Sequence, residues 1–221
     1  MYRRAVLTVV VIAAMVSPAL AQSRGQISAN IGWVLSDGVS GDAIRAGDGN
    51  TYDTLDPKDA ASFHFTVGFF TSPNTEVGFL YGRQFSELQV KGTATTAIDT
   101  MGVDNYHGYF AYNFGDPDAR VRPYALIGLG ATHYSGVNFT TSAGAARDIP
   151  GVTRFSTTWG AGVNAYAGGN VGFRAGVRWT PTYIKSDAAG WWCDPWWGCY
   201  VVGDAQYSNQ FELSGGVTFK F

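Results

Sequence analysis

The sequence predicts an all-β fold: an eight-stranded antiparallel up-and-down transmembrane β-barrel with short periplasmic turns and long extracellular loops. Three observations support this prediction. Residues 207–221 alternate between apolar and polar side chains and end on an aromatic residue, Phe221. Seven earlier segments show the same period of two, which is the period of a strand with one apolar and one polar face. The connections between the eight segments alternate in length, as they do in bacterial outer-membrane barrels.

The first four strands are expected at residues 26–35, 62–71, 75–86 and 102–114. In each segment one parity is mostly apolar or aromatic, while the other carries small or polar side chains. The apolar rows include Ile31 and Trp33, Phe63 and Phe65, Phe79 and Tyr81, and Phe110 and Tyr112. The opposite rows include Asn30, His64, Gln84 and Asn105.

The last four strands are expected at residues 121–133, 153–166, 171–181 and 207–221. Their apolar rows include Ile127 and Leu129, Phe155 and Trp159, Phe173 and Val177, and Phe211 and Leu213. Glycine and polar residues fill the opposite rows, as expected for side chains that point into a narrow lumen.

The connections fall into two classes. Residues 72–74, 115–118 and 168–170 are short turns rich in Gly, Pro, Asn and Asp, whereas residues 36–61, 87–101, 135–152 and 182–206 are long. A soluble β-sandwich has no reason to separate its loops in this way. Short periplasmic turns, long outer loops and an even strand number place both termini on the periplasmic side.

The first 21 residues have the features of a secretory signal peptide. Arg3 and Arg4 give a basic start, residues 5–16 form an apolar run, and residues 19–21 read Ala-Leu-Ala, a small-x-small cleavage site. The apolar run is too short for a spanning helix. We therefore expect cleavage near Ala21, with residues 1–21 as signal peptide and residues 22–221 as one outer-membrane β-barrel domain.

Charge and composition agree with this assignment. Removing the signal leaves thirteen basic against seventeen acidic residues, a net charge of −4, so no basic field for nucleic acid is expected. Glycine (29 residues) and aromatic residues (15%) are abundant. Aromatic side chains are favoured at membrane interfaces, and Trp33, Trp159 and Trp179 are expected in the outer belt.

Several motifs resemble those of known outer-membrane barrels. Ser214-x-Gly216-x-x-Phe219-x-Phe221 is similar to their carboxy-terminal recognition signal. The runs at 122–130, 160–162 and 171–174 resemble strands five to seven of small eight-stranded barrels of the OmpA/OmpW/opacity-protein type. The resemblance implies that Gly216, Phe219 and Phe221 are recognised by the barrel-assembly machinery. Such families include membrane anchors, adhesins and narrow pores, so the resemblance leaves the function open.

Charged residues on the inward rows are the first candidates for a site. Arg174, Arg178 and Glu212 are expected to form an ion-pair network in the lumen, because an unpaired buried charge is very costly. The alternative is that the same residues form a proton-sensitive or conformational gate. His64 and His107 are expected as hydrogen-bonded lumen residues rather than catalysts.

The last long connection holds both cysteines of the chain and a cluster of tryptophans. Cys193 and Cys199 are expected to form a disulfide, since the chain is directed to an oxidising compartment. The tryptophans either pack on the barrel mouth or form a recognition surface for glycan, lipid headgroup or protein. They are Trp191, Trp192, Trp196 and Trp197.

The first long connection is acidic. We expect a solvated polar loop that holds no metal ion, because the calcium-loop fragment at Asp48, Asn50 and Asp53 lacks further ligands. The alternative is that its carboxylates share the divalent ions of lipopolysaccharide. The acidic residues are Asp37, Asp42, Asp48, Asp53, Asp56 and Asp59.

One pair of residues resembles the lipid A deacylase arrangement. His133 and Ser135 share one parity at the outer end of the fifth strand, but nucleophilic catalysis also needs a group that orients the histidine. There is no Glu between Glu87 and Glu212, and Gly136 stands where that family has Asn. A lipid A-modifying hydrolase is therefore the third interpretation.

Together these observations predict an integral protein of the cell outer membrane that is not an enzyme and uses no cofactor. Its expected role is structural or a surface interaction through the extracellular loops. The alternative is a narrow porin-like channel or carrier for small or hydrophobic solutes. Expected partners are outer-membrane lipids, lipopolysaccharide, the barrel-assembly machinery and an unidentified extracellular ligand.

Overall fold

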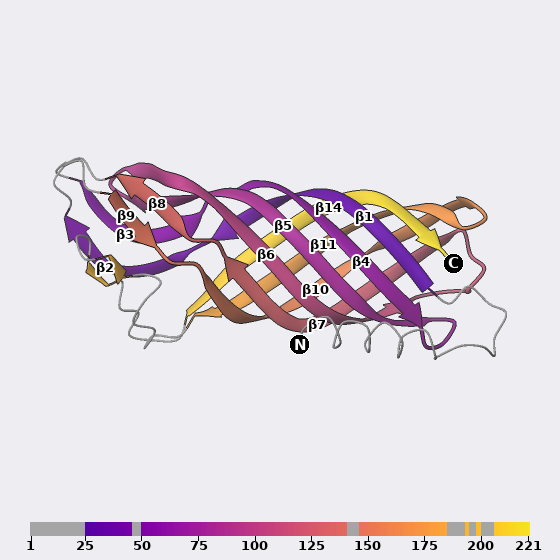
Figure 1. Ribbon diagram of the computed structural model, residues 1–221. Coiled ribbons are helices and arrows are strands. Elements are labelled where there is room, and N and C mark those ends of the chain that lie inside the picture. The colour runs from indigo at the N-terminus through magenta and orange to yellow at the C-terminus, as the bar shows by residue number, and fades with distance from the viewer. Residues whose placement is uncertain (1–24, 46–49, 141–145, 185–192, 195–197, 200–205) are drawn as a thin grey trace, which may run out of the picture.

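The computed structural model describes residues 25–45, 50–140, 146–184, 193–194, 198–199 and 206–221. Every regular element in these ranges is a β-strand, and eight long strands form the wall of a cylinder (Figure 1). They are β1 (Gly25–Asp37), β4 (Ala60–Phe70), β5 (Thr75–Gly92), β6 (Thr95–Asn113), β7 (Val121–Tyr134), β10 (Val152–Gly168), β11 (Val171–Ile184) and β14 (Gln206–Lys220).

The eight strands close into a ring in which each strand is antiparallel to both neighbours. The order is β1, β4, β5, β6, β7, β10, β11, β14 and back to β1. At the seam, Gly25 and Phe221 exchange two backbone hydrogen bonds of 3.0 and 2.9 Å. Closure matters because an open sheet edge cannot satisfy its backbone groups in hydrocarbon. The predicted eight-stranded barrel is therefore confirmed.

The barrel is apolar outside and polar inside. The outward side chains Ile31, Phe173 and Leu213 are 76%, 67% and 67% exposed, whereas Gln210, Glu212 and many other inward polar side chains are buried. This is the reverse of a soluble protein, in which large apolar patches are rarely exposed. A lipid phase in place of water outside the barrel accounts for the pattern.

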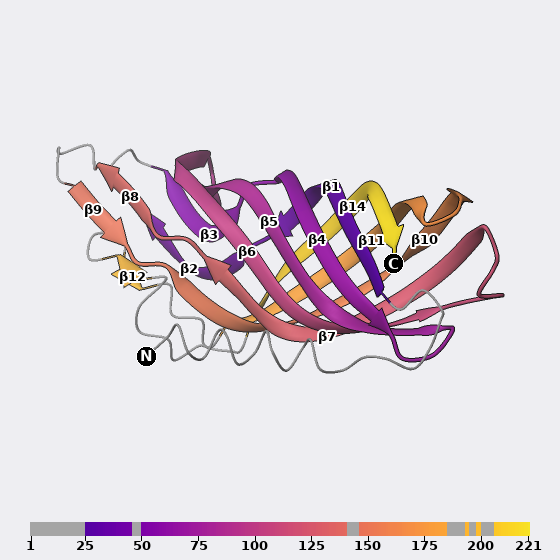
Figure 2. The same ribbon diagram turned by 45° about the vertical axis from the view of Figure 1, so that its right-hand side comes forward.

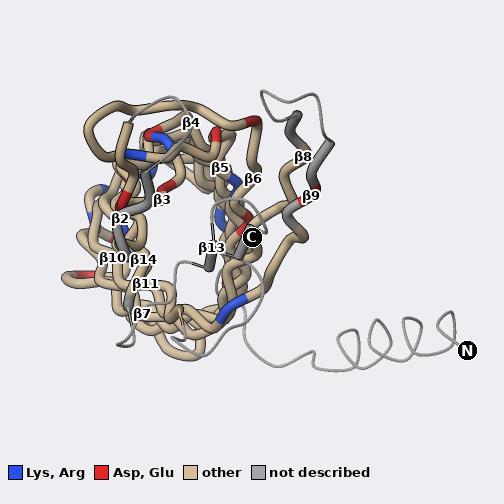
Figure 3. The backbone as a smooth tube through the Cα atoms, turned by 90° about the vertical axis from the view of Figure 1, so that its left-hand side faces the viewer, with Lys and Arg blue, Asp and Glu red and all other residues tan. Residues whose placement is uncertain are grey.

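The two ends of the barrel differ (Figures 1 and 2). The carboxy terminus and the short turns lie at one end, which we call the proximal end. At the other, the distal end, the wall strands continue into a further sheet, with β2 (Val39–Arg45) paired to β3 (Thr51–Pro57) and β3 paired to the end of β5. A hairpin of β8 (Val137–Thr140) and β9 (Ala146–Ile149) also lies here, beside the wall when the barrel is viewed along its axis (Figure 3).

The long connections thus hold more strand than the sequence suggested. Residues 87–92 and 95–101, expected as loop, continue β5 and β6 as a paired ribbon. The segment 36–61 contains β2 and β3, and 182–206 contains β12 (Cys193–Asp194) paired to β13 (Gly198–Cys199).

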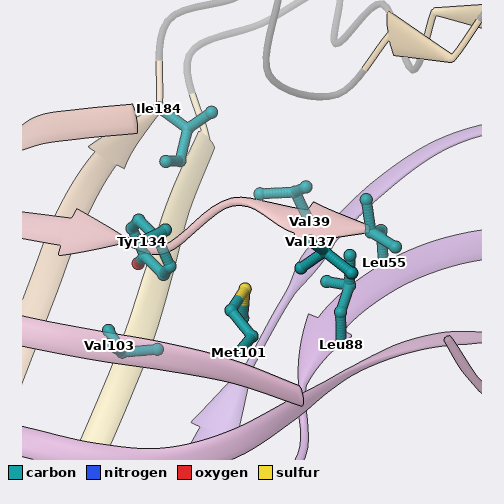
Figure 4. Close-up of a cluster of buried hydrophobic side chains, with 8 residues drawn as sticks. All are labelled: Val39, Leu55, Leu88, Met101, Val103, Tyr134, Val137 and Ile184. Carbon is teal, nitrogen blue, oxygen red and sulfur yellow. The ribbon is translucent and has the colours of Figure 1, made fainter. Parts of the chain in front are cut away.

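The distal ribbon has its apolar side chains inside, opposite to the membrane part of the same strands. Leu88 and Met101 point inward and pack with Val39, Tyr134 and Ile184 (Figure 4). The complete cluster also contains Leu55, Val103 and Val137. The exchange of faces occurs just beyond Phe85, the last large apolar side chain on the outward row of β5. A small hydrophobic core therefore lies at the distal end of the barrel.

Candidate functional site

The centre of the lumen holds a charge cluster around Glu212 on β14. Its carboxylate accepts hydrogen bonds from Ser62 Oγ at 2.7 Å, His64 Nδ1 at 3.1 Å and Arg178 Nε at 2.9 Å. Arg178 Nη2 also donates to this carboxylate. Three wall strands, β4, β11 and β14, thus meet on one buried anion. A buried cluster of this kind requires protein groups to replace the interactions lost with water. Within the described residues one donor of the cluster, Arg178 Nη1, has no hydrogen-bond partner.

Arg174 takes a different partner from the one expected. Its guanidinium lies over the ring of Tyr124, 4.0 Å from the centroid, in a cation–π contact. Four residues along one strand separate Arg174 from Arg178, about 13 Å at the usual rise, which is too far for both to reach Glu212. Gly162 and Gly176 make the contact possible, because a Cβ at either would lie within 2.7 Å of the Tyr124 hydroxyl. The predicted single network is therefore two separate contacts.

Hydrogen bonds join opposite walls of the barrel on the distal side of the charge cluster. Asn105 on β6 donates to Gln210 Oε1 on β14 at 3.1 Å, and β6 and β14 are diametrically opposite in the ring. Gln210 in turn donates to Gln84 Oε1 on β5 at 2.8 Å. Nearer the proximal end, the Tyr166 hydroxyl on β10 donates to Gln26 Oε1 on β1 at 2.7 Å. Side chains fill the lumen, as the diameter of an eight-stranded barrel favours.

The second lumen histidine belongs to the same polar filling. His107 Nε2 shares a 2.9 Å hydrogen bond with Ser156 Oγ, and Ser156 accepts a further bond from Thr132 at 2.9 Å. Both histidines thus lie inward on polar partners from other strands.

The outward tryptophans lie on the apolar face. Trp33, Trp159 and Trp179 are each at least 39% exposed. The Trp179 ring stacks on Phe211, with centroids 6.1 Å apart and planes inclined by 9°. The indole N–H of Trp179 donates to Asn209 at 3.1 Å. An apolar ring with one bonded polar tip suits a membrane interface.

A polar cluster on the outward face was missed by the sequence analysis. Asp104 on β6 accepts a 2.9 Å hydrogen bond from the Tyr81 hydroxyl and lies 3.7 Å from Arg83 Nη1. Asp104 and Arg83 occupy the parity that is otherwise apolar in their strands. The sequence does contain a signal for this cluster, because both charged residues stand near the end of an otherwise apolar outward row.

The suspected catalytic pair lies beside this cluster but has other partners. His133 Nδ1 is bonded to Thr153 Oγ1 at 2.9 Å. The Ser135 hydroxyl lies near Gly102, where a Cβ would be 3.1 Å from Ser135 Oγ and 2.8 Å from Arg83 Nη2. Asp104 is the direct cross-strand neighbour of His133, a carboxylate that the sequence analysis did not consider.

The acidic first connection is only partly solvated. Asp56 is buried on β3 and forms an ion pair with Lys91 on β5, with the two atoms 2.5 Å apart. The Asp59 carboxylate accepts the Ser36 backbone N–H at 2.8 Å. Asp48 lies outside the described residues. The expectation of a fully solvated loop is wrong for Asp56, because β3 pairs with β5 and the Asp56 side chain is enclosed beside Gly38 and Lys91.

The residues of the predicted carboxy-terminal signal lie at or near the seam between β1 and β14. Gly216 lies opposite Asn30, and a Cβ on it would come within 2.6 Å of Asn30 Cα. The Phe221 ring occupies the space above Gly25 and meets Phe69 edge to face at 6.4 Å. Phe219 is exposed on the outward face.

The tryptophan-rich connection is described only at its cysteines. Cys193 and Cys199 are directly opposite each other in the β12–β13 ladder. Trp191, Trp192, Trp196 and Trp197 lie outside the described residues.

In the part of the chain that the structure places, no helix is long and apolar enough to cross a membrane. Within the same part of the chain, no group of three or more His, Cys, Asp or Glu side chains is arranged to hold a metal ion.

Comparison with known proteins shows a shared fold. A scan against protein-family models gave no match, and a search of curated proteins found no matching relative. Among solved structures, the chain is similar to Neisserial surface protein A (TM-score 0.55, 16% identity, 89% of this chain and 97% of that one). It is also similar to the outer membrane protein OprG from Pseudomonas aeruginosa (TM-score 0.57, 14% identity, 90% and 96%). The fold is that of the small eight-stranded outer-membrane barrels.

Proposed function

We propose that this protein is a non-enzymatic component of the bacterial outer membrane whose function lies in its distal surface. The exposed apolar belt and the outer-membrane barrel fold support the location, and the signal-like residues 1–21 support export. With the carboxy terminus on the periplasmic side, the distal sheet projects outward from the cell.

The observation that supports this proposal is the filling of the lumen by buried, hydrogen-bonded side chains. The Asn105–Gln210 bond joins diametrically opposite walls, and the hydrophobic cluster around Met101 and Tyr134 lies distal to it. A filled lumen disfavours solute passage and leaves the outer surface as the functional part. The distal strands build a folded platform on which a partner could bind.

Single-channel recording in planar bilayers tests the closed lumen. Refolded wild-type protein is expected to show no discrete openings. The double variant Asn105→Gly, Gln210→Gly, which removes the cross-lumen bridge, provides a matched comparison. Reproducible openings of the wild type would instead support the alternative, a narrow channel or carrier.

Surface recognition is tested separately. We propose that the aromatic side chains around the Cys193–Cys199 pair form the contact surface. Purified protein in nanodiscs would be applied to glycan and extracellular-protein arrays, beside a variant in which Trp191, Trp192, Trp196 and Trp197 are replaced by serine. Binding that the variant loses would support the proposal. Equal signals from both proteins would refute this choice of surface.

The absence of catalysis is also part of the proposal. His133 is bonded to Thr153, and Ser135 lies beside Arg83, so the contacts differ from those of a serine nucleophile activated by histidine. Release of acyl chains from lipid A by the wild type, lost in Ser135→Ala, would refute a non-enzymatic role.

A further inference from the structure

A groove of about 650 Å³ lies on the outward face where the apolar belt ends. It crosses β1, β4, β5 and β6, and its walls include Trp33, Phe85, Lys58, Arg83 and Ser135. Trp33 and Phe85 are 53% and 60% exposed and form an apolar side. The groove is thus amphipathic, with two cations next to two aromatic rings.

The level of the groove along the barrel axis can be estimated from the strand. The outward row of β5 is apolar from Val77 to Phe85, interrupted by Arg83, and continues with Glu87. Eight residues of a strand tilted by about 40° span about 20 Å, most of the roughly 25 Å apolar band of such barrels. Arg83 is the outward residue next to Phe85, one step closer to the middle of the apolar band. Its long side chain therefore reaches the headgroup level.

Arg83 has more donors than the protein satisfies. A guanidinium carries five N–H groups. In the described residues its charge partner is Asp104, 3.7 Å from Nη1, and the Arg83 side chain is 40% exposed. Nη2 and the Ser135 hydroxyl both lie close to Gly102, so the hydroxyl is a second donor on the groove wall. Acyl chains cannot accept these bonds, so the acceptor must come from a lipid headgroup or from water.

Lys58 supplies a second cation at the rim. Its ammonium pairs with Glu87 at 2.9 Å, and its side chain is 50% exposed. The three carboxylates of Asp104, Glu87 and Asp59 outnumber the two cations, so the groove has no long-range positive field. Recognition therefore depends on contact geometry, and the planar fork of arginine fits phosphate oxygens better than a point charge does.

We propose that this groove binds the phosphate group of an anionic lipid of the outer leaflet, with Arg83 as the main ligand. Ser135 donates a further hydrogen bond, Lys58 contributes charge at the rim, and Trp33 and Phe85 contact the apolar part of the lipid. The phosphorylated glycolipid lipid A has this chemistry. The assignment rests on the proposed insertion in the outer membrane with the distal end outward.

The test compares wild type, Arg83→Gln and Arg83→Lys after refolding in phosphatidylcholine nanodiscs. Arg120→Gln is the matched control, because Arg120 is an exposed arginine in a turn at the proximal end. Heat-modifiable gel migration first shows that each barrel is closed and inserted. Native mass spectrometry then measures the retention of lipid A against dephosphorylated lipid A.

Wild type and Arg120→Gln are expected to retain lipid A about tenfold over its dephosphorylated form, the factor for one charge-assisted hydrogen bond. Arg83→Gln is expected to lose this preference, and Arg83→Lys to keep part of it. An undiminished preference in Arg83→Gln, or equal retention of both lipids by wild type, overturns the proposal. Displacement of lipid A by millimolar inorganic phosphate would assign the site to free phosphate and overturn the lipid assignment. Failure of the wild type to insert would refute the membrane location as well, whereas insertion without lipid selectivity refutes this site alone.

Discussion

The charge cluster in the lumen allows a quantitative prediction at Glu212. Glu212→Gln keeps the shape of the side chain but removes the charge that balances Arg178, which is buried on the neighbouring strand. Breaking a buried ion pair by neutralising one partner costs about 3–5 kcal/mol, because the other charge stays in a poor solvent. With a urea m-value of about 2 kcal/mol/M, a loss of about 4 kcal/mol lowers the unfolding midpoint by about 2 M.

Glu87→Gln is the matched control. Glu87 also pairs with a basic side chain at 2.9 Å, but it is 40% exposed, and such surface pairs contribute at most about 1 kcal/mol. Lys220→Ala, at the proximal rim, gives a second comparison and should also be milder than the change at Glu212. Replacing Arg178 by methionine in the Glu212→Gln background should recover part of the loss, since the orphaned charge is then removed.

The assay is urea unfolding of the refolded barrel in lipid vesicles, followed by tryptophan fluorescence and by gel mobility without heating. Equal midpoints for Glu212→Gln and Glu87→Gln would refute the argument that burial makes the pair at Glu212 costly to break. No recovery in the double variant would show that Arg178 is not the source of the penalty.

Three further predictions concern the seam, the distal sheet and the cysteines. Gly216→Val should prevent heat-modifiable barrel formation because its Cβ meets the backbone of β1, while Gly215→Val should fold, since its Cβ would have no atom nearer than 4.0 Å; equal folding of the two would contradict this. Burial raises the pKa of the Asp56 carboxyl above its ordinary value of 3.8, against the effect of the Lys91 ammonium. The folded state therefore disfavours the ionised form of Asp56. The contribution of protonated Asp56 to the free energy of unfolding is fully present below the ordinary pKa and is lost as the pH rises through the pKa of the folded state. Asp56→Asn should thus slow hydrogen exchange of β3 amides at pH 7 and have no effect near pH 3; equal exchange at pH 7 would count against it. Reduction of the protein should raise its intact mass by two hydrogen atoms if Cys193 and Cys199 are bonded, and an unchanged mass would exclude the disulfide.

The membrane part of the fold was predictable because lipid imposes a simple pattern. Outward rows such as Phe211 and Leu213 are apolar over the full span, and the inward row at Gln210 and Glu212 is polar, so period and parity locate each strand. The short turns then fix the antiparallel order. The number of such segments gives the number of strands. Closure follows because a sheet edge cannot satisfy its backbone groups in lipid.

The distal sheet was harder to predict because its pattern is inverted. Beyond Phe85, the apolar residues Leu88 and Val90 continue on the inward parity, so a search for an apolar outward row ends too early. A search for a change of parity within one segment would have extended β5 and β6.

The partners of the polar side chains could not be predicted from the sequence. The position of Arg174 beside Tyr124, and not at the Glu212 cluster, depends on the stagger between strands, which period and parity do not specify. The groove at Arg83 likewise joins residues from four strands that are far apart in the sequence.

The continuity of the wall strands into the distal sheet has a mechanical consequence. A load applied to that sheet along the barrel axis has a large component along β5 and β6, which are paired from Thr75 to Lys91 and tilted by about 40° to the axis. Rupture in this direction requires many ladder bonds to shear at once, whereas a flexible loop would extend first. The paired β5–β6 ribbon is therefore expected to resist such a load better than a flexible connection would.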